Sequence, residues 1–397
     1  MQVSTQPAPL RILIAHNRYQ QRGGEDAVVE EEAQMLRARG HEVHLYLRDN
    51  HDLPDMPKAQ AALQTLWSSR TTAEVGHVFE AFRPDLLHVH NTFPLISPSI
   101  YWAAAKHRIP VVQTLHNFRL VCPQGLMLRD GRPCEDCVGR LPWPGVVHAC
   151  YRQSRAQTGV LAAMLAGHRA LGTWSHRITR YIALNKFCRD RFVAGGLPAE
   201  KIRIKPNSVD LPASPAQERE GFLFVGRLSS EKGIEVLAEA AHAVALPLPI
   251  RIAGTGPEAA LVDGHPGLQA LGALSPDAVY AEMRHAKALV LPSIWYENFP
   301  RTLVEAFACG LPVIASRLGA MSALIEDGKT GLLFDAGDAA DLAAKLSWAE
   351  THPRQMAAMG HAARAVYERD LTSAANYRQL IDIYAEASAE CRQRGAT

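Results

Sequence analysis

The sequence predicts two doubly wound α/β domains that face one cleft, with a cysteine-rich loop inserted in the first domain. At 397 residues the chain is too long for one typical core. Short apolar runs alternate with helical patterns in both halves, which is the signature of parallel sheets. A turn-rich stretch, 206–215, separates the halves and has the composition of a linker. Ligands of such sheets bind at the carboxyl ends of the strands, so two facing domains would share one cleft.

The first half, residues 1–205, is predicted to form the amino-terminal domain. Its first strand is followed by Gly23 and Gly24 and then by an acidic helix from Glu25 to Arg39. The predicted strands are 11–16, 42–46, 86–90, 110–116 and 181–185. The cysteine-rich loop occupies residues 119–152.

The second half, residues 206–372, repeats the strand and helix alternation and is predicted to form the second domain. Its predicted strands are 221–228, 249–254, 268–274, 286–293, 312–317 and 331–334. The remaining segment, 373–397, contains a helix that we expect to pack at the domain junction.

The composition is that of a soluble globular protein, with 47% hydrophobic and 21% charged residues. The formal net charge of +2 excludes no class of partner. Residues 1–7 lack the basic and apolar segments of a signal peptide, and no apolar run is long enough to span a bilayer. We therefore expect a cytoplasmic protein. This expectation includes peripheral attachment to the inner face of the cell membrane. Its cysteines would stay reduced unless they bind a metal.

Two carboxylates flank a predicted helix start in the second half. Glu297 falls in the loop before the helix, Pro300 suits the first turn, and Glu305 lies on the helix itself. The free N–H groups at such a start favour a phosphate. One acid would then meet sugar hydroxyls and the other a ribose. The alternative interpretation is an ordinary capped helix with solvated carboxylates.

A pair of cations follows the first strand of the second domain. Arg227 comes directly after Gly226 at the strand end, and Lys232 stands where the next helix opens. An arginine binds a diphosphate through two N–H groups, and a lysine adds a point charge. A solvated loop is the alternative.

Four further positions at strand ends give weaker signals. Gly254 belongs to a G-x-G turn, for which a plain tight turn is the favoured interpretation, and Leu274 ends the next strand, where backbone groups would meet a nucleobase. In the first domain Gly24 precedes a helix and leaves the N–H groups of its N-terminus at Glu25 accessible to a ligand. His116 ends the fourth strand and could orient a sugar hydroxyl, although a buried structural histidine is the commoner role.

In this order the motifs resemble the retaining glycosyltransferases of family four, which have the GT-B fold of two Rossmann-like domains. The resemblance covers nearly the whole chain. It is carried by Gly23-Gly24, His116, Asn207-Ser208-Val209-Asp210, Gly226-Arg227-Leu228, Lys232-Gly233, Gly254-Thr255-Gly256 and the Glu297 to Glu305 segment. Ser208 stands where the family usually has glycine, which tightens the hinge turn and removes no chemistry.

The resemblance implies a role for each site residue. Arg227 and Lys232 would hold the donor diphosphate, Glu305 the ribose and Glu297 the donor sugar, while His116 would contact the transferred sugar. Of these, His116, Glu297, Arg227 and Lys232 are the predicted catalytic group. The remaining donor-site positions are Gly24, Gly226, Gly254, Leu274, Asn298, Phe299, Pro300 and Leu303, with Gly24 meeting a phosphate or the acceptor. No catalytic divalent metal is expected, because the cations and the helix dipole would neutralise the diphosphate.

The activity implied is transfer of a hexose, with retention, from a GDP- or UDP-sugar to a saccharide acceptor. The acceptor would be lipid-linked and belong to surface polysaccharide synthesis. The departing phosphate oxygen would accept the acceptor proton, and Glu297 as a covalent nucleophile is the less favoured route. The rivals are an epimerase or phosphorylase on a similar fold, and a metal-clipped carbohydrate-binding or scaffold protein with an inactive site. The sequence still contains the two cations, Arg227 and Lys232, and the two carboxylates, Glu297 and Glu305, which argues against an inactive site.

Four cysteines in the loop after His116 have the spacing C-x11-C-x2-C-x12-C, and they are Cys122, Cys134, Cys137 and Cys150. The central C-x2-C fits one side of a tetrahedral thiolate site, so structural Zn²⁺ is the favoured interpretation. Free thiols and an iron–sulfur cluster remain alternatives, and His148 could replace one ligand.

The stretch from Cys137 to Arg189 contains no Asp or Glu and is rich in arginine. Its apolar residues Val160, Leu161, Met164, Leu165, Leu171 and Trp174 recur at helical spacing. A basic amphipathic helix suits an anionic membrane surface or a diphosphate lipid, whereas a core-packed helix with solvated arginines is the alternative. Nucleic acid is not expected as a partner, because no recognition motif is present.

Overall fold

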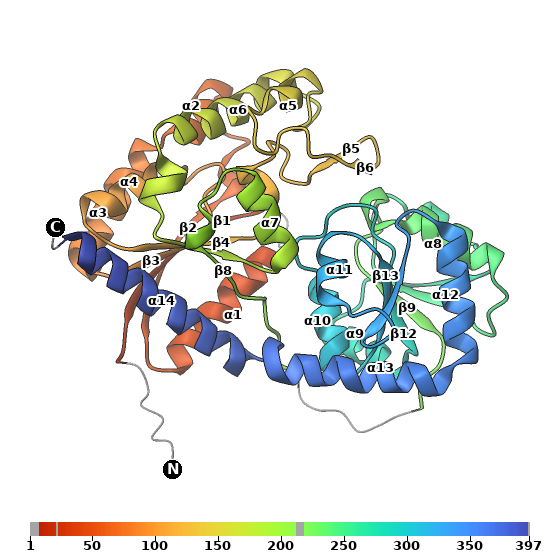
Figure 1. Ribbon diagram of the computed structural model, residues 1–397. Coiled ribbons are helices and arrows are strands. Elements are labelled where there is room, and N and C mark those ends of the chain that lie inside the picture. Colours follow the sequence, from red (N-terminus) through yellow and green to blue (C-terminus); the bar gives the residue numbers. More distant parts are fainter. Residues whose placement is uncertain (1–7, 21–22, 212–217, 396–397) are drawn as a thin grey trace, which may run out of the picture. The chain divides into compact units, whose positions relative to one another are not determined.

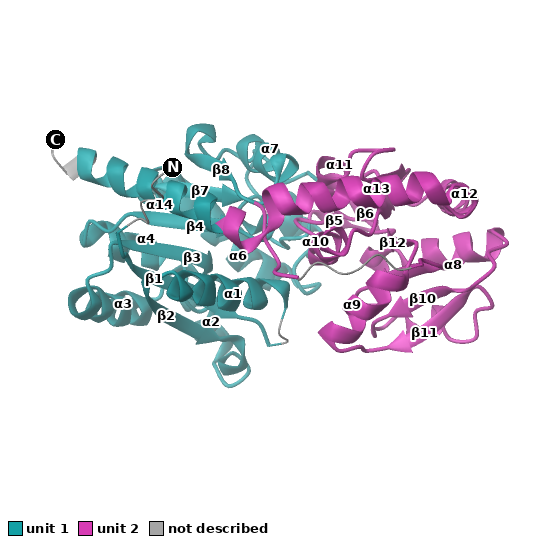
Figure 2. Ribbon diagram, turned by 90° about the horizontal axis from the view of Figure 1, so that it is seen from below, with its two compact units in different colours: residues 1–126, 135–205, 377–397 teal, residues 127–134, 206–376 magenta. Residues whose placement is uncertain are grey.

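A computed structural model describes residues 8–20, 23–211 and 218–395 of the chain. These residues form two compact units, shown in different colours in Figure 2. Unit 1 comprises 1–126, 135–205 and 377–397, and unit 2 comprises 127–134 and 206–376. Residues 212–215 of the predicted linker, and the residues 1–7 inspected for a signal peptide, lie outside the described part of the chain.

Unit 1 is built on a six-stranded parallel sheet in the order β2-β1-β3-β4-β7-β8 (Figure 1). The strands are β1 Arg11–Arg18, β2 Glu42–Asp49, β3 Leu86–Asn91, β4 Val111–Leu115, β7 Arg180–Ala183 and β8 Ile202–Ile204. The helices are α1 Gly24–Ala38, α2 Lys58–Leu66, α3 Ser69–Phe82, α4 Ser99–Lys106, α5 Trp143–Val147, α6 Arg155–Ala170 and α7 Lys186–Ala194. All five strands predicted for this half are present, and β8 was missed because a three-residue strand carries almost no periodicity.

The carboxyl-terminal helix α14 Ser373–Gly395 completes the core of unit 1. Its buried residues Leu380, Ile383 and Tyr384 pack with Ile12 and other side chains of β1, β4 and α1. Tyr377 Oη also lies 2.8 Å from His41 Nε2, at the start of β2. The core of unit 1 is therefore completed only by the last helix of the chain, which packs on the same face of the sheet as α1.

Unit 2 has a second six-stranded parallel sheet in the order β11-β10-β9-β12-β13-β14. The strands are β9 Phe222–Val225, β10 Ile250–Ala253, β11 Leu268–Gly272, β12 Ala288–Leu291, β13 Val313–Ser316 and β14 Gly331–Phe334. The helices are α8 Ile234–Ala243, α9 Pro276–His285, α10 Arg301–Ala308, α11 Gly319–Leu324, α12 Ala339–Thr351 and α13 Pro353–Val366. A short antiparallel hairpin, β5 Leu128–Arg129 with β6 Arg132–Pro133, groups with this unit.

Alternation along the strands of unit 2 divides its core between the two faces of the sheet. Phe222 and Phe224 of β9 point to one face, where α8 and α12 pack. Leu223 points to the other face and joins a cluster that includes residues of α10 and α13. Each unit thus has a parallel sheet and its own core, and the predicted α/β fold class is confirmed.

Candidate active site

The strand order of unit 2 reverses between β9 and β12, and the candidate donor residues follow these two strands. Counted within the unit, the order is 3-2-1-4-5-6, so the chain winds in opposite directions from that point. Gly226, Arg227 and Lys232 come after β9, and Glu297 comes after β12. The carboxyl ends of neighbouring strands at such a reversal form the ligand crevice of open α/β sheets.

Lys232 and Glu297 are in direct contact at this edge. Lys232 Nζ donates to Glu297 Oε1 at 2.6 Å, and Ser293 Oγ donates to the same oxygen at 2.8 Å. Glu297 is buried, whereas Lys232 is half-buried and its ammonium also lies 5.6 Å from the centre of the Trp295 ring. Arg227 is exposed. The edge therefore presents two cations that are accessible to an anionic ligand and one carboxylate that is already held in place.

The second carboxylate, Glu305, lies on α10 and is oriented by two neighbours. Arg301 Nε donates to Glu305 Oε1 at 2.9 Å, one helical turn before it. Tyr280 Oη approaches the same oxygen at 3.4 Å, and burial raises the pKa of this tyrosine. Pro300 precedes the helix, and among the residues that the structure describes no side-chain capping hydrogen bond is found at its N-terminus. The first-turn N–H groups of α10 are thus directed at the same edge as Arg227 and Lys232.

Gly254 holds the loops of the donor edge together by close backbone packing. A Cβ at this position would lie 1.8 Å from Gly226 O, and the residue has a φ of 152°. Gly254 N donates to Gly272 O at 2.8 Å, and Gly226 N donates to Ala253 O at 3.0 Å. The G-x-G turn therefore joins the loops after β9, β10 and β11, as expected for a tight turn.

The other predicted donor positions follow the same edge but differ in what they can offer. Asn298 and Phe299 are half-buried in the loop after β12, and Leu274 is half-buried after β11. Leu303 has no exposed surface and packs in the core, and its N–H donates to Pro300 O at 3.1 Å. Its side chain therefore packs α10 against the core of unit 2.

In unit 1 the predicted residues lie at the carboxyl edge of the first sheet. Gly24 is exposed at the start of α1, directly after β1, and His116 follows β4 with 9% of its surface exposed. Between them, Glu25 accepts hydrogen bonds from Tyr19 Oη at 2.9 Å and Asn117 Nδ2 at 3.0 Å. Burial raises the pKa of Glu25. A polar edge with one histidine and one carboxylate is suited to binding hydroxyl groups.

His116 is supported by side chains that the sequence analysis did not select. Its Nε2 lies 2.9 Å from His90 Nδ1, and the two rings stack. His90 in turn approaches Glu32, which pairs with Lys205. The two histidines of β3, His88 and His90, alternate on one face of a buried strand, and this was the signal available in the sequence.

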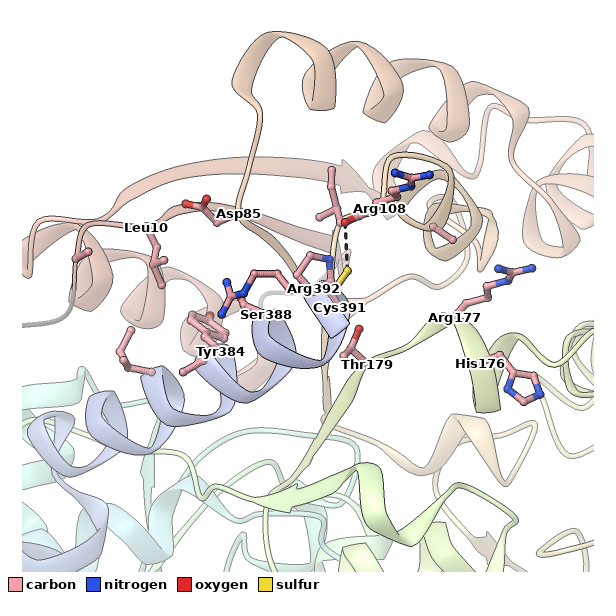
Figure 3. A pocket seen from close by; sticks show the side chains of 16 residues that line it. Leu10, Asp85, Arg108, His176, Arg177, Thr179, Tyr384, Ser388, Cys391 and Arg392 are labelled. Atoms are coloured by element: carbon pink, nitrogen blue, oxygen red, sulfur yellow. Dashed lines mark hydrogen bonds between the residues drawn. The ribbon is translucent and has the colours of Figure 1, made fainter. Parts of the chain in front are cut away.

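A large pocket of unit 1 lies at the opposite edge of the sheet. Figure 3 shows its side chains, among them Asp85 before β3, Thr179 before β7 and Tyr384 of α14. A hydrogen bond from Cys391 Sγ to Arg108 O crosses it at 3.3 Å. Its lining residues outside α14 include Leu10, Asp85 and Thr179, which precede β1, β3 and β7, so this pocket is remote from the carboxyl edge where doubly wound sheets bind their ligands.

The cysteine-rich loop is divided between the units, with Cys122, Cys137 and Cys150 in unit 1 and Cys134 in the segment that groups with unit 2. Cys137 is buried, while Cys122, Cys134 and Cys150 are half-buried. A Cβ at Gly145 would lie 3.6 Å from Cys137 Sγ and 3.2 Å from the Pro123 ring, and Cys150 N donates to Gly145 O at 3.0 Å. Cys137, Cys150 and Pro123, which follows Cys122, therefore all lie next to Gly145.

The basic segment uses its helical apolar face for packing. Leu161, Met164, Leu165 and Trp174 are buried, so these residues belong to the core, as the alternative interpretation proposed. Leu171 of the same pattern is 59% exposed, and further exposed apolar side chains lie at α5, where Leu141 and Trp143 are each 68% exposed. Within the described ranges, no helix combines the length and apolar character needed to cross a bilayer.

Two doubly wound units with this arrangement of cations and carboxylates define an enzyme class that acts on nucleotide sugars. Residues 22–212 match the family model "Glycosyltransferase Family 4", and residues 212–366 match "Glycosyl transferases group 1". The two matches adjoin and together account for most of the chain. The protein belongs to the family-four glycosyltransferases with the GT-B fold.

Individual relatives agree with this membership. A phosphatidyl-myo-inositol mannosyltransferase of Mycobacterium leprae is 34% identical over 44% of this chain, and that alignment spans 50% of the relative's own length. A D-inositol 3-phosphate glycosyltransferase of Thermomonospora curvata is 25% identical over 92% of this chain and 91% of its own. The structure of Anabaena HepE in complex with UDP is similar with a TM-score of 0.66 and 18% identity, over 95% of this chain and 100% of that one.

Proposed function

We propose that this protein is a retaining glycosyltransferase that moves a hexose from a nucleotide-diphosphate sugar to a saccharide acceptor. The observation that carries the proposal is the contact of Lys232 with Glu297 at the strand-order reversal of unit 2, beside the exposed Arg227. The cations match a diphosphate, and the held carboxylate matches sugar hydroxyls. Glu305, oriented by Arg301, is suited to the two hydroxyls of a ribose.

In the proposed mechanism the acceptor hydroxyl attacks the anomeric carbon on the face from which the nucleotide leaves. The C–O bond to the nucleotide breaks, and the departing phosphate oxygen takes the acceptor proton. Arg227, Lys232 and the N-terminus of α10 stabilise the negative charge that develops on the diphosphate. Glu297 already accepts from Lys232 and Ser293, which favours it as a hydroxyl-binding group over a nucleophile.

A thermal-shift panel of GDP, UDP and ADP, each alone and as its sugar, tests the donor site and identifies the base. We expect one diphosphate to raise the unfolding temperature and its sugar to release nucleotide slowly in the absence of acceptor. Glu297→Gln should then lower kcat for that donor, with Glu326→Gln as an exposed control in the same unit. No shift and no nucleotide release with any donor would instead favour the scaffold alternative.

We further propose that the acceptor is lipid-linked and belongs to surface polysaccharide synthesis. Support comes from an exposed apolar patch of Leu141, Trp143 and Val147 on and before α5, with the exposed arginines Arg140, Arg152 and Arg155 around it. Such a patch fits an anionic membrane surface. Sedimentation with phosphatidylcholine vesicles, with and without phosphatidylglycerol, should show binding only to the anionic vesicles. Trp143→Ser should abolish it, and Leu248→Ser in unit 2 serves as the control. Equal binding to both vesicles, or none, would contradict the proposal.

We also propose that Cys122, Cys134, Cys137 and Cys150 hold one structural Zn²⁺. The loop has little regular structure, and a metal would order it where its own apolar side chains are too few. Cys137 Sγ and the backbone of Cys150 lie next to Gly145, and the ion pair of Glu135 with Arg191 of α7 at 2.5 Å fixes the C-x2-C turn. Metal analysis of the pure protein should find one equivalent of zinc that Cys137→Ser loses and Cys309→Ser keeps. Less than one equivalent of zinc or iron would overturn the site.

A further inference from the structure

A chain of buried polar side chains leads from the interior of unit 1 to His116. Lys205 Nζ lies 3.3 Å from Glu32 Oε2, and both residues are almost fully buried. The other carboxylate oxygen, Oε1, lies 2.9 Å from His88 Nδ1 and 3.3 Å from His90 Nε2. His90 Nδ1 then meets His116 Nε2 at 2.9 Å. The chain passes from α1 through β3 to the residue that follows β4.

The charge state of Glu32 fixes the direction of this chain. Burial by itself would raise the pKa of Glu32, but the Lys205 ammonium and the imidazole of His88 outweigh it and hold this pKa well below its usual value. Glu32 is therefore a carboxylate, which only accepts hydrogen bonds. A lone pair on His90 Nε2 would face that negative charge, so the proton of His90 lies on Nε2.

The placement of this proton determines which hydrogen bonds His116 can make. Because His90 carries its proton on Nε2, its Nδ1 is an acceptor, and His116 must donate to it from its own Nε2. His116 Nδ1 is then the lone-pair nitrogen. Within the described part of the chain, the contact with His90 is the one hydrogen bond found for the His116 ring, so Nδ1 remains for a ligand.

We propose that Glu32 and His90 are positioning residues that hold His116 as its neutral Nε2–H tautomer, so that His116 Nδ1 accepts a hydrogen bond from a hydroxyl of the transferred sugar. This inference rests on the proposed function. The inference specifies the direction of the hydrogen bond between unit 1 and the sugar: His116 accepts it and does not act as a charged donor.

The same carboxylate and imidazoles could instead ligate a metal, since Glu32, His88 and His90 have ligand atoms within 4.8 Å of one another. Glu32 Oε1 and His90 Nε2 also lack a well-aligned hydrogen bond within the described residues. The buried Lys205 ammonium argues against a divalent ion, because it already neutralises Glu32 and would repel a second cation bound beside that carboxylate. The network therefore contains one ion pair.

The direct test is the tautomer of His116 in the intact wild-type protein. Long-range ¹H–¹⁵N correlation spectra of protein labelled at histidine nitrogen distinguish Nε2–H, Nδ1–H and the imidazolium form. His116→Asn identifies the His116 signals by their disappearance. We expect a neutral Nε2–H ring for both His116 and His90 throughout pH 6 to 8. An Nδ1–H ring or an imidazolium at His116 would overturn the proposal, whatever the activity of the enzyme.

Glu32→Gln tests the consequence for catalysis. The amide can turn its NH₂ group toward His90 Nε2, which moves the His90 proton to Nδ1 and reverses the hydrogen bond to His116. We expect His116 to become the Nδ1–H tautomer and kcat to fall on the order of 10- to 100-fold, as for lost outer-shell partners. The dissociation constant of the nucleoside diphosphate should stay unchanged, because its site lies in unit 2. Glu31→Gln, an exposed neighbour on the same helix, should change none of these quantities.

Three outcomes contradict, respectively, the positioning role of Glu32, the absence of a metal in this network and the proposed function. A Glu32→Gln protein that keeps the wild-type tautomer of His116, or keeps kcat, removes Glu32 from the positioning role. If Glu32→Gln does not fold, His90→Gln provides the second variant, and the wild-type spectra remain decisive. A metal equivalent lost in Glu32→Gln but kept in Cys137→Ser would establish the metal alternative. Absence of transfer by the wild-type enzyme with every donor would refute the proposed function and leave the tautomer assignment intact.

Discussion

The candidate ligand edge of unit 2 presents accessible cations, whereas that of unit 1 presents hydrogen-bond acceptors. In unit 2 the cations Arg227 and Lys232 remain accessible, and the nearby carboxylate is held by a direct contact with Lys232. In unit 1 the histidine at the edge is backed by a second imidazole, and the full charges of Lys205 and Glu32 are buried behind them. Charge at the first edge can meet a diphosphate. The imidazole and the carboxylate at the second edge suit the hydroxyls of a sugar.

The two edges also differ in what would disturb them. In the pair of Lys232 and Glu297 the lysine is half-buried, so its ammonium can turn to an anionic ligand while Ser293 keeps its hydrogen bond to the buried carboxylate. The buried pair of Lys205 and Glu32 tolerates no such exchange, since removal of one partner leaves an uncompensated charge in the interior. Donor binding can therefore rearrange unit 2 locally, while the polar interior of unit 1 has to remain as it folds.

The largest expected effect is an acid sensitivity that comes from unit 1. Burial lowers the pKa of His90 to about 3, and burial next to His90 holds that of His116 well below its usual value. An unfolded histidine binds a proton near pH 6.5. Below that pH the unfolded chain takes up protons that the folded chain does not, so stability is complete above pH 6.5 and is lost as the pH falls. The free energy of unfolding should fall by about 1.4 kcal/mol per pH unit for each histidine, and so by about 3 kcal/mol per pH unit for the two.

Calorimetric unfolding between pH 8 and pH 5 measures this sensitivity. The unfolding temperature should be flat above pH 7 and fall steeply below pH 6.5, and His90→Asn should make the fall shallower. His51→Gln, at an exposed position of the same unit, should leave the pH profile unchanged. An unfolding temperature that is constant from pH 7 to pH 5 would show that the histidines of unit 1 are protonated in the folded protein.

Replacement of Lys232 probes the charged edge of unit 2. Lys232→Gln removes a cation from the diphosphate site and one hydrogen bond from Glu297. We expect kcat/KM to fall on the order of 10²- to 10³-fold, the usual loss for one electrostatic contact to a developing negative charge. Lys329→Gln removes an exposed cation of the same unit and should leave kcat/KM unchanged. Equal activity of the two variants would exclude Lys232 from the chemistry.

The difference between the edges also explains what the sequence could reveal. In unit 2 the important residues lie in the loops that follow β9 and β12, two strands that the periodicity identifies, although Lys232 and Glu297 are 65 positions apart in the chain. Ser293 and Arg301, which orient the two carboxylates, were missed because serine and arginine at loop and helix positions are common. Local pattern therefore located the site but not its supporting contacts.

In unit 1 the supporting residues are far apart in sequence, and no local pattern connects them. Glu32 lies on a helix that reads as acidic and solvated, and Lys205 follows a strand too short to recognise. Their pairing across more than 170 positions depends on the strand order of the sheet. The sequence consequently supports His116 as a candidate, whereas its tautomer follows only from the assembled fold.

Glycines at the two edges give a third, smaller contrast. Gly254→Ala in unit 2 would place a methyl group 1.8 Å from Gly226 O at a φ of 152°. We expect a loss of about 1–3 kcal/mol in the free energy of unfolding of unit 2, with weaker nucleotide binding as the loop after β9 moves. Gly264→Ala also changes a glycine with a positive φ, of 75°, but no atom lies within 4 Å of the new methyl group. Urea unfolding of both variants separates the clash from the backbone strain, and equal losses would assign no packing role to Gly254.

Gly24 in unit 1 is expected to have the smallest effect on stability of the positions considered. No atom lies within 4 Å of a Cβ added there, and its φ is not in the left-handed region, so Gly24→Ala should change the free energy of unfolding by less than about 1 kcal/mol. If the backbone of Gly24 approaches a phosphate or the acceptor, the methyl group will displace that ligand. Activity should then fall on the order of tenfold or more, since small misplacements of reactants are costly. Gly159→Ala, in the open surface of α6, is the matched control and should keep both stability and activity. Full activity in Gly24→Ala would show that the unit 1 edge binds its ligand through side chains alone.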